Sequence, residues 1–451
     1  MKISRIKIKD FHQFKDLTVD LTYPKGHKKE GQPLDKVCFI GQSGTGKTSL
    51  LELIPKLLVN YNTQFVSKLG EKSIADKTEM SFSFGYDGEY TTDVSIKEKK
   101  KESETYITRT WGNYEYKKSD IEFKEILSFF RDTWLNDIAT KLIYFPASLN
   151  FDIDLDDSQT LDARSIIDFS KEKVSTVWNI ILEKIQFYQE QELQIRQEIL
   201  RTVERADNDI ETIKKALSKL EEWKKTEFNP IQDIADNCLD KLLAPFKLKV
   251  KTELDIKSKD DIGFIKIKDY SGNEIPNGLW STGTKQVVLT ALPLYLLKPK
   301  HTVILYDEPE RSLYPDLQRL IVDYYSSLGT DCQFFYATHS PIIASNFEPW
   351  EIVELKFDVE GHIYREIYFE GENHVNNYKL NPQNMRWDDI LQRIFDMEND
   401  GSILRKQKLD KLASNNVKYR KLVKQGKEDT EDAKSILSNI HLLSKELSKW
   451  E

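Results

Sequence analysis

The sequence has 451 residues, of which 39% are hydrophobic, 11% aromatic and 31% charged. This balance is typical of a globular protein and excludes a long disordered chain, which would carry fewer aromatic residues. The formal net charge of −8 at pH 7 argues against a dedicated nucleic-acid-binding protein, because such proteins are usually basic overall. A local basic patch would still allow DNA contact.

The chain carries no signal for export or for a membrane. Its three cysteines, Cys38, Cys238 and Cys332, lie far apart and match neither a disulfide framework nor a metal-ligand spacing. The first ten residues lack the apolar core of a signal peptide. The longest apolar run, residues 287–297, is shorter than the roughly 18 residues that a spanning helix needs. We therefore expect a cytoplasmic protein.

The first third of the chain predicts mostly strands. Apolar residues alternate with polar ones over residues 3–21, and the unbroken apolar run VCFI at 37–40 predicts a buried central strand. The segment GQSGTGKT follows at once and leads into a stretch with helical spacing. Residues 80–111 predict antiparallel hairpins, and residues 142–147 predict another buried strand that ends at a proline.

The rest of the chain predicts a helical insertion followed by further buried strands. Residues 158–229 contain neither Gly nor Pro, and their apolar spacing predicts two long helices that turn near 206–208, pack as a short antiparallel coiled coil and end at Pro230. Strand-like alternation returns over 246–270, and buried strands are expected at 302–309 and 333–341. After residue 370 we expect helices around 388–396 and over 429–450.

The segment GQSGTGKT has the spacing G-x-x-x-x-G-K-[ST] between a strand and a helix. Glycines allow the backbone to wrap around a phosphate at a helix N-terminus, where N–H groups point inward. Lys47 would reach the β- and γ-phosphates, and the Thr48 hydroxyl would take a Mg²⁺ position. The alternative is a Gly-rich turn without a ligand. The predicted nucleotide-binding residues are Gly41, Gln42, Ser43, Gly44, Thr45, Gly46, Lys47, Thr48 and Ser49.

Two further strand ends carry candidate catalytic residues. In VILYDEPE, Asp307 is placed to hold Mg²⁺ together with Thr48, and Glu308 can polarise the attacking water as a general base. In ATHSP, His339 could hydrogen-bond the γ-phosphate or that water. Taken alone, an Asp-Glu pair is often a solvated loop and a strand-end histidine is often structural.

A third motif, WSTGTKQ at 280–286, precedes an apolar helix. Ser281 and Gly283 would form an anion-binding helix N-terminus. An ordinary N-cap would give the same pattern.

In this order the motifs resemble those of the ATP-binding cassette superfamily, and more narrowly the stand-alone heads related to SMC, Rad50, RecF and the OLD-type ATPases. WSTGTKQ resembles the signature LSxGxKQ of that branch, with Trp280 in place of the leucine, and residues 311–316 resemble its D-loop. The resemblance covers residues 1–60 and 275–345. The Q-loop glutamine is not fixed by the sequence, since Gln64 and the segment 147–150 are both candidates.

The resemblance implies an α/β fold: a P-loop ATPase head with a mixed sheet, flanking helices and an antiparallel β subdomain. It implies ATP and Mg²⁺ as cofactors and a head-to-tail homodimer or higher homo-oligomer. Ser281, Gly283 and Gln286 of one chain would then contact the ATP held by the phosphate loop of the other. The expected parts are residues 1–157 and 236–370 for the head, 158–235 for the helical insertion and 371–451 for a helical accessory region.

Three functions fit these features. The first is a sensor or scaffold ATPase of a prokaryotic antiviral system, resembling those of Septu, PARIS or retron-linked loci, that controls a separately encoded nuclease or toxin. The second is a RecF- or Rad50-like repair ATPase that clamps DNA, although the insertion reaches only about 50 Å at 1.5 Å per residue. The third is a scaffold that binds ATP without hydrolysing it, which the glutamate at 308 argues against. The basic and apolar C-terminal run is either a docking surface or a small bundle.

No nuclease centre is evident in the sequence, and we expect none in this chain. We interpret the acidic cluster of Asp152, Asp154, Asp156 and Asp157 as a solvated loop.

Overall fold

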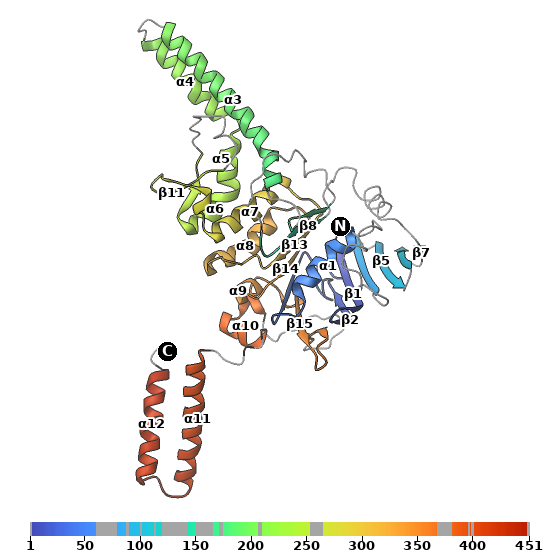
Figure 1. Ribbon diagram of the computed structural model, residues 1–451, viewed down its shortest axis with the longest axis vertical. Coiled ribbons are helices and arrows are strands. Elements are labelled where there is room, and N and C mark those ends of the chain that lie inside the picture. Colours follow the sequence, from blue (N-terminus) through green and yellow to red (C-terminus); the bar gives the residue numbers. More distant parts are fainter. Residues whose placement is uncertain are drawn as a thin grey trace. The chain divides into compact units, whose positions relative to one another are not determined.

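The computed structural model describes residues 2–59, 79–86, 90–99, 102–111, 114–119, 142–149, 166–170, 175–205, 210–252, 265–367, 381–395, 397 and 401–448. The chain divides into two compact units, Met1–Met385 and Arg386–Glu451 (Figure 1). The second unit begins 15 residues after the accessory region expected from the sequence.

A 13-stranded mixed sheet is the centre of the first unit. In spatial order its strands are β7 (Tyr114–Ser119), β6 (Glu102–Trp111), β5 (Tyr90–Lys99), β4 (Glu79–Tyr86), β1 (Ile3–Phe11), β2 (Phe14–Asp20), β16 (Ile363–Arg365), β15 (Ile352–Phe357), β3 (Lys36–Gly41), β14 (Gln333–Ala337), β13 (Val303–Asp307), β8 (Leu142–Phe145) and β9 (Ile166–Asp168). A small antiparallel sheet contains β10 (Leu248–Val250), β11 (Ile267–Asp269) and β12 (Glu274–Ile275).

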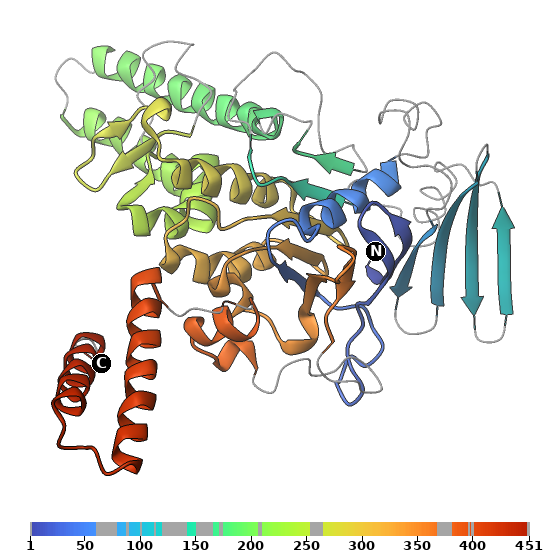
Figure 2. The ribbon, with the colours of Figure 1, turned by 60° about the horizontal axis from the view of Figure 1, so that its bottom comes forward.

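The large sheet has a parallel part and an antiparallel part. Strands β15, β3, β14, β13, β8 and β9 are parallel neighbours. Strands β7 to β4 form hairpins that join β1 and β2 (Figure 2). The predicted α/β fold with a mixed sheet and an antiparallel β subdomain is confirmed.

Helices flank the sheet and form the accessory parts. In the first unit they are α1 (Lys47–Val59), α3 (Ser175–Arg205), α4 (Ile210–Thr226), α5 (Pro230–Ile234), α6 (Asp240–Leu243), α7 (Thr282–Leu297), α8 (Pro315–Ser327) and α9 (Pro341–Ala344). In the second unit they are α10 (Trp387–Arg393), α11 (Ile403–Lys424) and α12 (Glu431–Leu447). No helix in these described parts is long and apolar enough to cross a membrane.

The two faces of the central strands bury different side chains, because successive residues of a strand point to opposite faces. Leu305 and Phe335 belong to the core that contains the apolar residues of α1. Tyr306 and Tyr336 face the other way, where Tyr306 stacks on Tyr325 of α8 at 5.3 Å and on Tyr336 at 5.0 Å between ring centroids. Helices α1 and α8 therefore cover opposite faces of the sheet.

The insertion is a helical hairpin that extends from the first unit (Figure 1). Helices α3 and α4 run antiparallel, since the ion pairs Glu198–Lys219 at 2.8 Å and Glu192–Lys224 at 3.0 Å join them in reverse order. The predicted turn near 206–208 lies outside the described residues. Helix α4 ends at Thr226, and Pro230 is the first residue of the next helix, α5.

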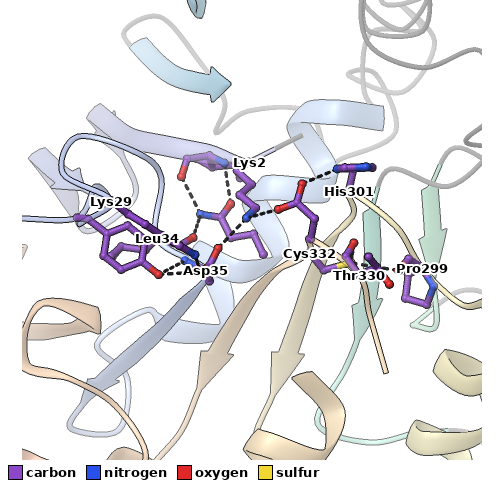
Figure 3. Close-up of polar contacts among 12 residues, drawn as sticks. Lys2, Lys29, Leu34, Asp35, Pro299, His301, Thr330 and Cys332 are labelled. Atoms are coloured by element: carbon purple, nitrogen blue, oxygen red, sulfur yellow. Dashed lines mark hydrogen bonds and ion pairs between the residues drawn. The ribbon is translucent and has the colours of Figure 1, made fainter. Parts of the chain in front are cut away.

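A polar cluster ties the N-terminus to the amino ends of the central strands (Figure 3). Lys2 Nζ lies 2.6 Å from Asp35 Oδ1 and 2.7 Å from Asp331 Oδ1, and His301 contacts the same Asp331. The buried Gln333 side chain bonds the backbone of Ile3 in both directions, accepting at 2.6 Å and donating at 2.9 Å. These contacts fix β1 against β14 at the edge opposite to the strand ends that carry the predicted motifs.

The second unit contains a hairpin of α11 and α12. Lys408 Nζ and Glu446 Oε2 join the two helices at 2.9 Å, and the side chains of Ser402 and Thr430 cap their N-termini. Helices near 388–396 and 429–450 were predicted. Most of α11 lies in the basic and apolar C-terminal run, whose helical spacing was interpreted as a docking surface or a small bundle.

Candidate functional site

The predicted motifs meet at one edge of the parallel sheet. Strand β14 lies between β3 and β13, and all three run in the same direction. Their carboxyl ends are Gly41, Ala337 and Asp307. Because ligands of open α/β sheets bind outside the carboxyl ends of strands, this edge is the place for a site. The phosphate loop, Glu308 and His339 are thereby brought together.

The loop at 41–48 has the backbone shape that its glycines allow. Gly41 has φ 147° and Gly46 has φ 75°. A Cβ at Gly41 would lie 2.3 Å from Leu355 O, and one at Gly46 would lie 2.5 Å from Phe14 Cζ. Both positions therefore exclude other residues by conformation and by contact. The exposed residues of the loop and the following turn are Gln42, Ser43, Gly44, Thr48 and Ser49, whereas Thr45 is buried and donates to Gln42 O at 2.8 Å.

Lys47 is folded into this loop. Its Nζ donates to Gly41 O at 2.9 Å and to Gln42 O at 3.0 Å, and the residue is only 5% exposed. Burial lowers the pKa of Lys47 to about 8, although the carboxylates of Glu308 and Asp307 oppose this change. The amine is therefore still cationic at neutral pH. A phosphate group bound in the loop would take the place of the two carbonyl oxygens as the partner of Lys47 Nζ.

Thr48 and Asp307 form a pair of oxygen donors beside the loop. Thr48 Oγ1 donates to Asp307 Oδ1 at 3.0 Å. Adjacent ligands of an octahedral Mg²⁺ at 2.0–2.1 Å lie roughly 3 Å apart, so these two oxygens fit that ion. Burial raises the pKa of Asp307 to about 6, helped by Glu308 and Glu52, while the hydrogen bond from Thr48 opposes it.

Glu308 and His339 face each other across the strand ends. Glu308 Oε1 lies 3.8 Å from His339 Nε2, and each side chain is 38% exposed. Glu308 has φ 45°, a conformation that is costly for a non-glycine residue and that occurs preferentially at functional sites. Burial and the nearby Lys47 cation lower the pKa of His339, so its imidazole is neutral at physiological pH.

The motif WSTGTKQ forms the beginning of α7. Ser281 is exposed and caps the helix by accepting from the N–H of Thr284 at 3.1 Å. A Cβ at Gly283 would lie 2.7 Å from Ser312 O, so this glycine is needed for packing within the chain. Gln286 is buried within α7. Of the three predicted residues, only Ser281 is exposed.

The structure adds residues that sequence reasoning missed. Glu310, in the turn after β13, and Gln318, in α8, form hydrogen bonds with Thr338 and Ser340, which follow β14. The second glutamate of DEPE was the available signal for this network. Of the Q-loop candidates, Gln64 lies outside the described residues, whereas in the segment 147–150 Ala147 O accepts a bond from Arg311 at 3.4 Å. The acidic cluster at 152–157 also lies outside the described residues.

Comparisons with known proteins agree with this geometry at the family level. The family model of the AAA ATPase domain matches residues 1–344. No curated protein matches the sequence.

Similar solved structures include three SMC heads. The head with an extended coiled coil from Pyrococcus furiosus, bound to the C-terminal domain of ScpA, is 14% identical with a TM-score of 0.39, over 81% of this chain and 96% of the other. The head from Thermotoga maritima is 14% identical with a TM-score of 0.41, over 81% and 98%. A head bound to the C-winged helix domain of ScpA is 13% identical with a TM-score of 0.41, again over 81% and 98%.

Proposed function

Because this chain belongs to the AAA ATPase domain family, we propose that it is a Mg²⁺-dependent ATPase of the ATP-binding cassette type, related to the SMC and Rad50 heads. The observation that carries the proposal is the meeting of Lys47, the Thr48–Asp307 pair and the Glu308–His339 pair at one edge of the sheet. Phosphoryl transfer from ATP needs these groups: a cation in a phosphate loop, oxygen ligands for Mg²⁺ and a residue that orients water.

Each residue would have one role. The loop N–H groups and Lys47 would bind the β- and γ-phosphates, and Thr48 and Asp307 would hold Mg²⁺, which neutralises charge on those phosphates when bound. Glu308 is exposed enough to reach a water molecule and would accept its proton. The neutral His339 would donate a hydrogen bond to the γ-phosphate or to that water.

We place the second half of the site on another copy of the chain. Ser281 is exposed at the N-terminus of the 16-residue helix α7, and such an end attracts anions. The hydrogen bonds of its side chain within its own chain are with Thr284. In a head-to-tail dimer, Ser281 of one protomer would complete the phosphate site of its partner, with Gly283 maintaining the close approach of the helix to residue 312.

A mixing experiment tests this sharing. Lys47→Ala removes the phosphate loop cation, and Ser281→Arg blocks the opposite contribution, so each variant alone should be inactive. A heterodimer of the two variants contains one intact composite site, built from the loop of the Ser281→Arg chain and Ser281 of the Lys47→Ala chain. Random pairing in an equal mixture should restore about a quarter of wild-type turnover. A mixture as inactive as its components would contradict a shared site.

The biological role that we propose is that of a sensor or scaffold in a prokaryotic antiviral defence complex, where ATP controls a separately encoded nuclease or toxin. The α3–α4 hairpin offers a surface for a partner protein, because it exposes five large apolar side chains. These are Phe187, Leu193, Leu200, Ile210 and Leu217. Co-expression with the product of a neighbouring gene should give a complex whose effector activity changes in Glu308→Gln. If the effector were equally active with and without this chain, the proposed role would be wrong.

A second candidate, a DNA-clamping ATPase of the RecF or Rad50 kind, is favoured by α11. This helix has eight Lys and Arg residues and a single acidic one, Asp410, within a chain of net charge −8. A basic helix can neutralise phosphates, and its binding would weaken as salt increases. Fluorescence anisotropy with labelled duplex DNA over a salt series would distinguish this candidate from the first.

A further inference from the structure

Glu310 is a partly buried acidic residue to which the proposed ATPase chemistry gives no role. Its Oε1 accepts two hydrogen bonds, from Thr338 Oγ1 at 2.5 Å and from the backbone N–H of His339 at 3.2 Å. Its Oε2 is buried and has no hydrogen-bond partner among the described residues. A buried carboxylate oxygen without a hydrogen-bond partner costs free energy. The position therefore calls for an explanation.

The two bonds belong to a larger network around the turn that follows β14. Thr338 Oγ1 donates to Glu310 and accepts from the N–H of Ser340 at 2.9 Å. Ser340 Oγ donates to Gln318 Oε1 at 2.7 Å, and Gln318 Nε2 donates to Leu313 O at 2.8 Å. Residues 338–340 are thus tied to residues 310–318, the segment that follows β13.

This turn determines where the imidazole of His339 points. The side chain is 38% exposed, and its Nε2 lies 3.8 Å from Glu308 Oε1. Such a contact is too long to be a hydrogen bond and does not hold the residue by itself. The backbone N–H of His339, in contrast, is bonded to Glu310. Fixing the backbone in advance removes an ordering cost from the catalytic step.

We propose that Glu310 is a positioning residue, which through Oε1 holds the turn at 338–340 so that His339 stays aligned with Glu308 and the phosphate loop. The expected effect of Glu310 on ATP turnover rests on the proposed ATPase function. The expected effect of Glu310 on the order of the turn at 338–340 does not. The role requires an acceptor oxygen at the position of Oε1. It does not require a negative charge, because the structure gives Oε2 no bond to make.

Two substitutions separate these requirements. Glu310→Gln can keep a carbonyl oxygen at the position of Oε1 and removes the charge, while Glu310→Ala removes both. Turnover is measured at saturating ATP and Mg²⁺, and hydrogen–deuterium exchange of the peptide 336–343 is followed in the nucleotide-free protein. We expect Glu310→Ala to lower kcat by about 10- to 100-fold, the range for a misplaced catalytic group, with KM for ATP within about twofold. We expect its His339 and Ser340 amides to exchange at least about tenfold faster, and Glu310→Gln to stay near wild type in both assays.

Thr338→Val provides an independent variant if Glu310→Ala does not fold. It is isosteric and removes both the donor to Oε1 and the acceptor of the Ser340 N–H, so it should reproduce the loss of kcat and the faster exchange of the His339 amide, while Thr338→Ser should restore both. Wild-type exchange and wild-type kcat in Glu310→Ala or in Thr338→Val would overturn the proposal.

A Glu310→Gln protein as slow as Glu310→Ala would also overturn it, since the charge would then be the required feature. If the wild-type protein showed no turnover at all, the ATPase proposal would fail, and the exchange experiment would still decide the role of Glu310.

Discussion

Replacing Asp307 with asparagine should abolish ATP hydrolysis and at the same time make the folded protein more stable at neutral pH. Asp307 is 4% exposed, and burial raises its pKa from 3.8 to about 6. The ionised carboxylate is therefore less favourable in the folded chain than in the unfolded one. Asparagine removes this charge and can still accept the hydrogen bond from Thr48.

The magnitude follows from the pKa. A group whose pKa is raised by folding stabilises the protein below its unfolded pKa and loses this contribution as pH rises through its folded pKa. For Asp307 the loss occurs between about pH 4 and pH 6, and the gap between 3.8 and about 6 corresponds to roughly 3 kcal/mol. The free energies of unfolding of Asp307→Asn and wild type should be equal near pH 4. They should differ by up to about 3 kcal/mol at pH 8.

Urea unfolding without Mg²⁺ at several pH values measures this difference, and Glu308→Gln is the matched control. Glu308 is 38% exposed, so its neutralisation should change stability much less than that of Asp307, for which it removes only one of the repelling charges. Added Mg²⁺ should stabilise wild type more than Asp307→Asn, because the ion binds the folded carboxylate. An Asp307→Asn protein that is less stable than wild type at every pH would refute the reasoning.

Two further predictions concern the loop and the core. Gly46→Ala should lower the melting temperature by several degrees and weaken ATP binding in calorimetry, because its Cβ would meet Phe14 at 2.5 Å. Gly26→Ala is the control for the conformational cost alone, because Gly26 has φ 85° and a Cβ there would meet nothing within 4 Å. An equal loss of melting temperature in the two variants would contradict the steric argument. Glu351 is 4% exposed with a pKa raised to about 7 by burial, so wild-type stability should fall as pH rises from about 4.5 past 7. Glu351→Gln should flatten this part of the pH profile in urea unfolding, and an unchanged profile would exclude Glu351 as its source.

The sequence was sufficient where the physical requirement is local. The glycine spacing at 41–46 follows from backbone conformations that only glycine adopts readily, and the apolar runs before Asp307 and His339 mark buried parallel strands. Since parallel strands present their carboxyl ends at one edge, the motifs could be assembled without coordinates.

It was insufficient where the requirement is a long-range contact. Glu310 and Thr338 are 28 residues apart and meet only because β13 and β14 are neighbours. The packing of Gly283 against residue 312 has no sequence signal that separates it from a ligand-binding glycine. For the basic C-terminal run that contains most of α11, the helical spacing did not decide between a docking surface and a small bundle, because both expose the same charged residues.

The most direct test of the account is a structure of Glu308→Gln with ATP and Mg²⁺. We expect a dimer in which each ATP lies between the phosphate loop of one chain, with Lys47 on its phosphates, and Ser281 of the other. ATP bound elsewhere, or held entirely by one chain, would contradict the shared site.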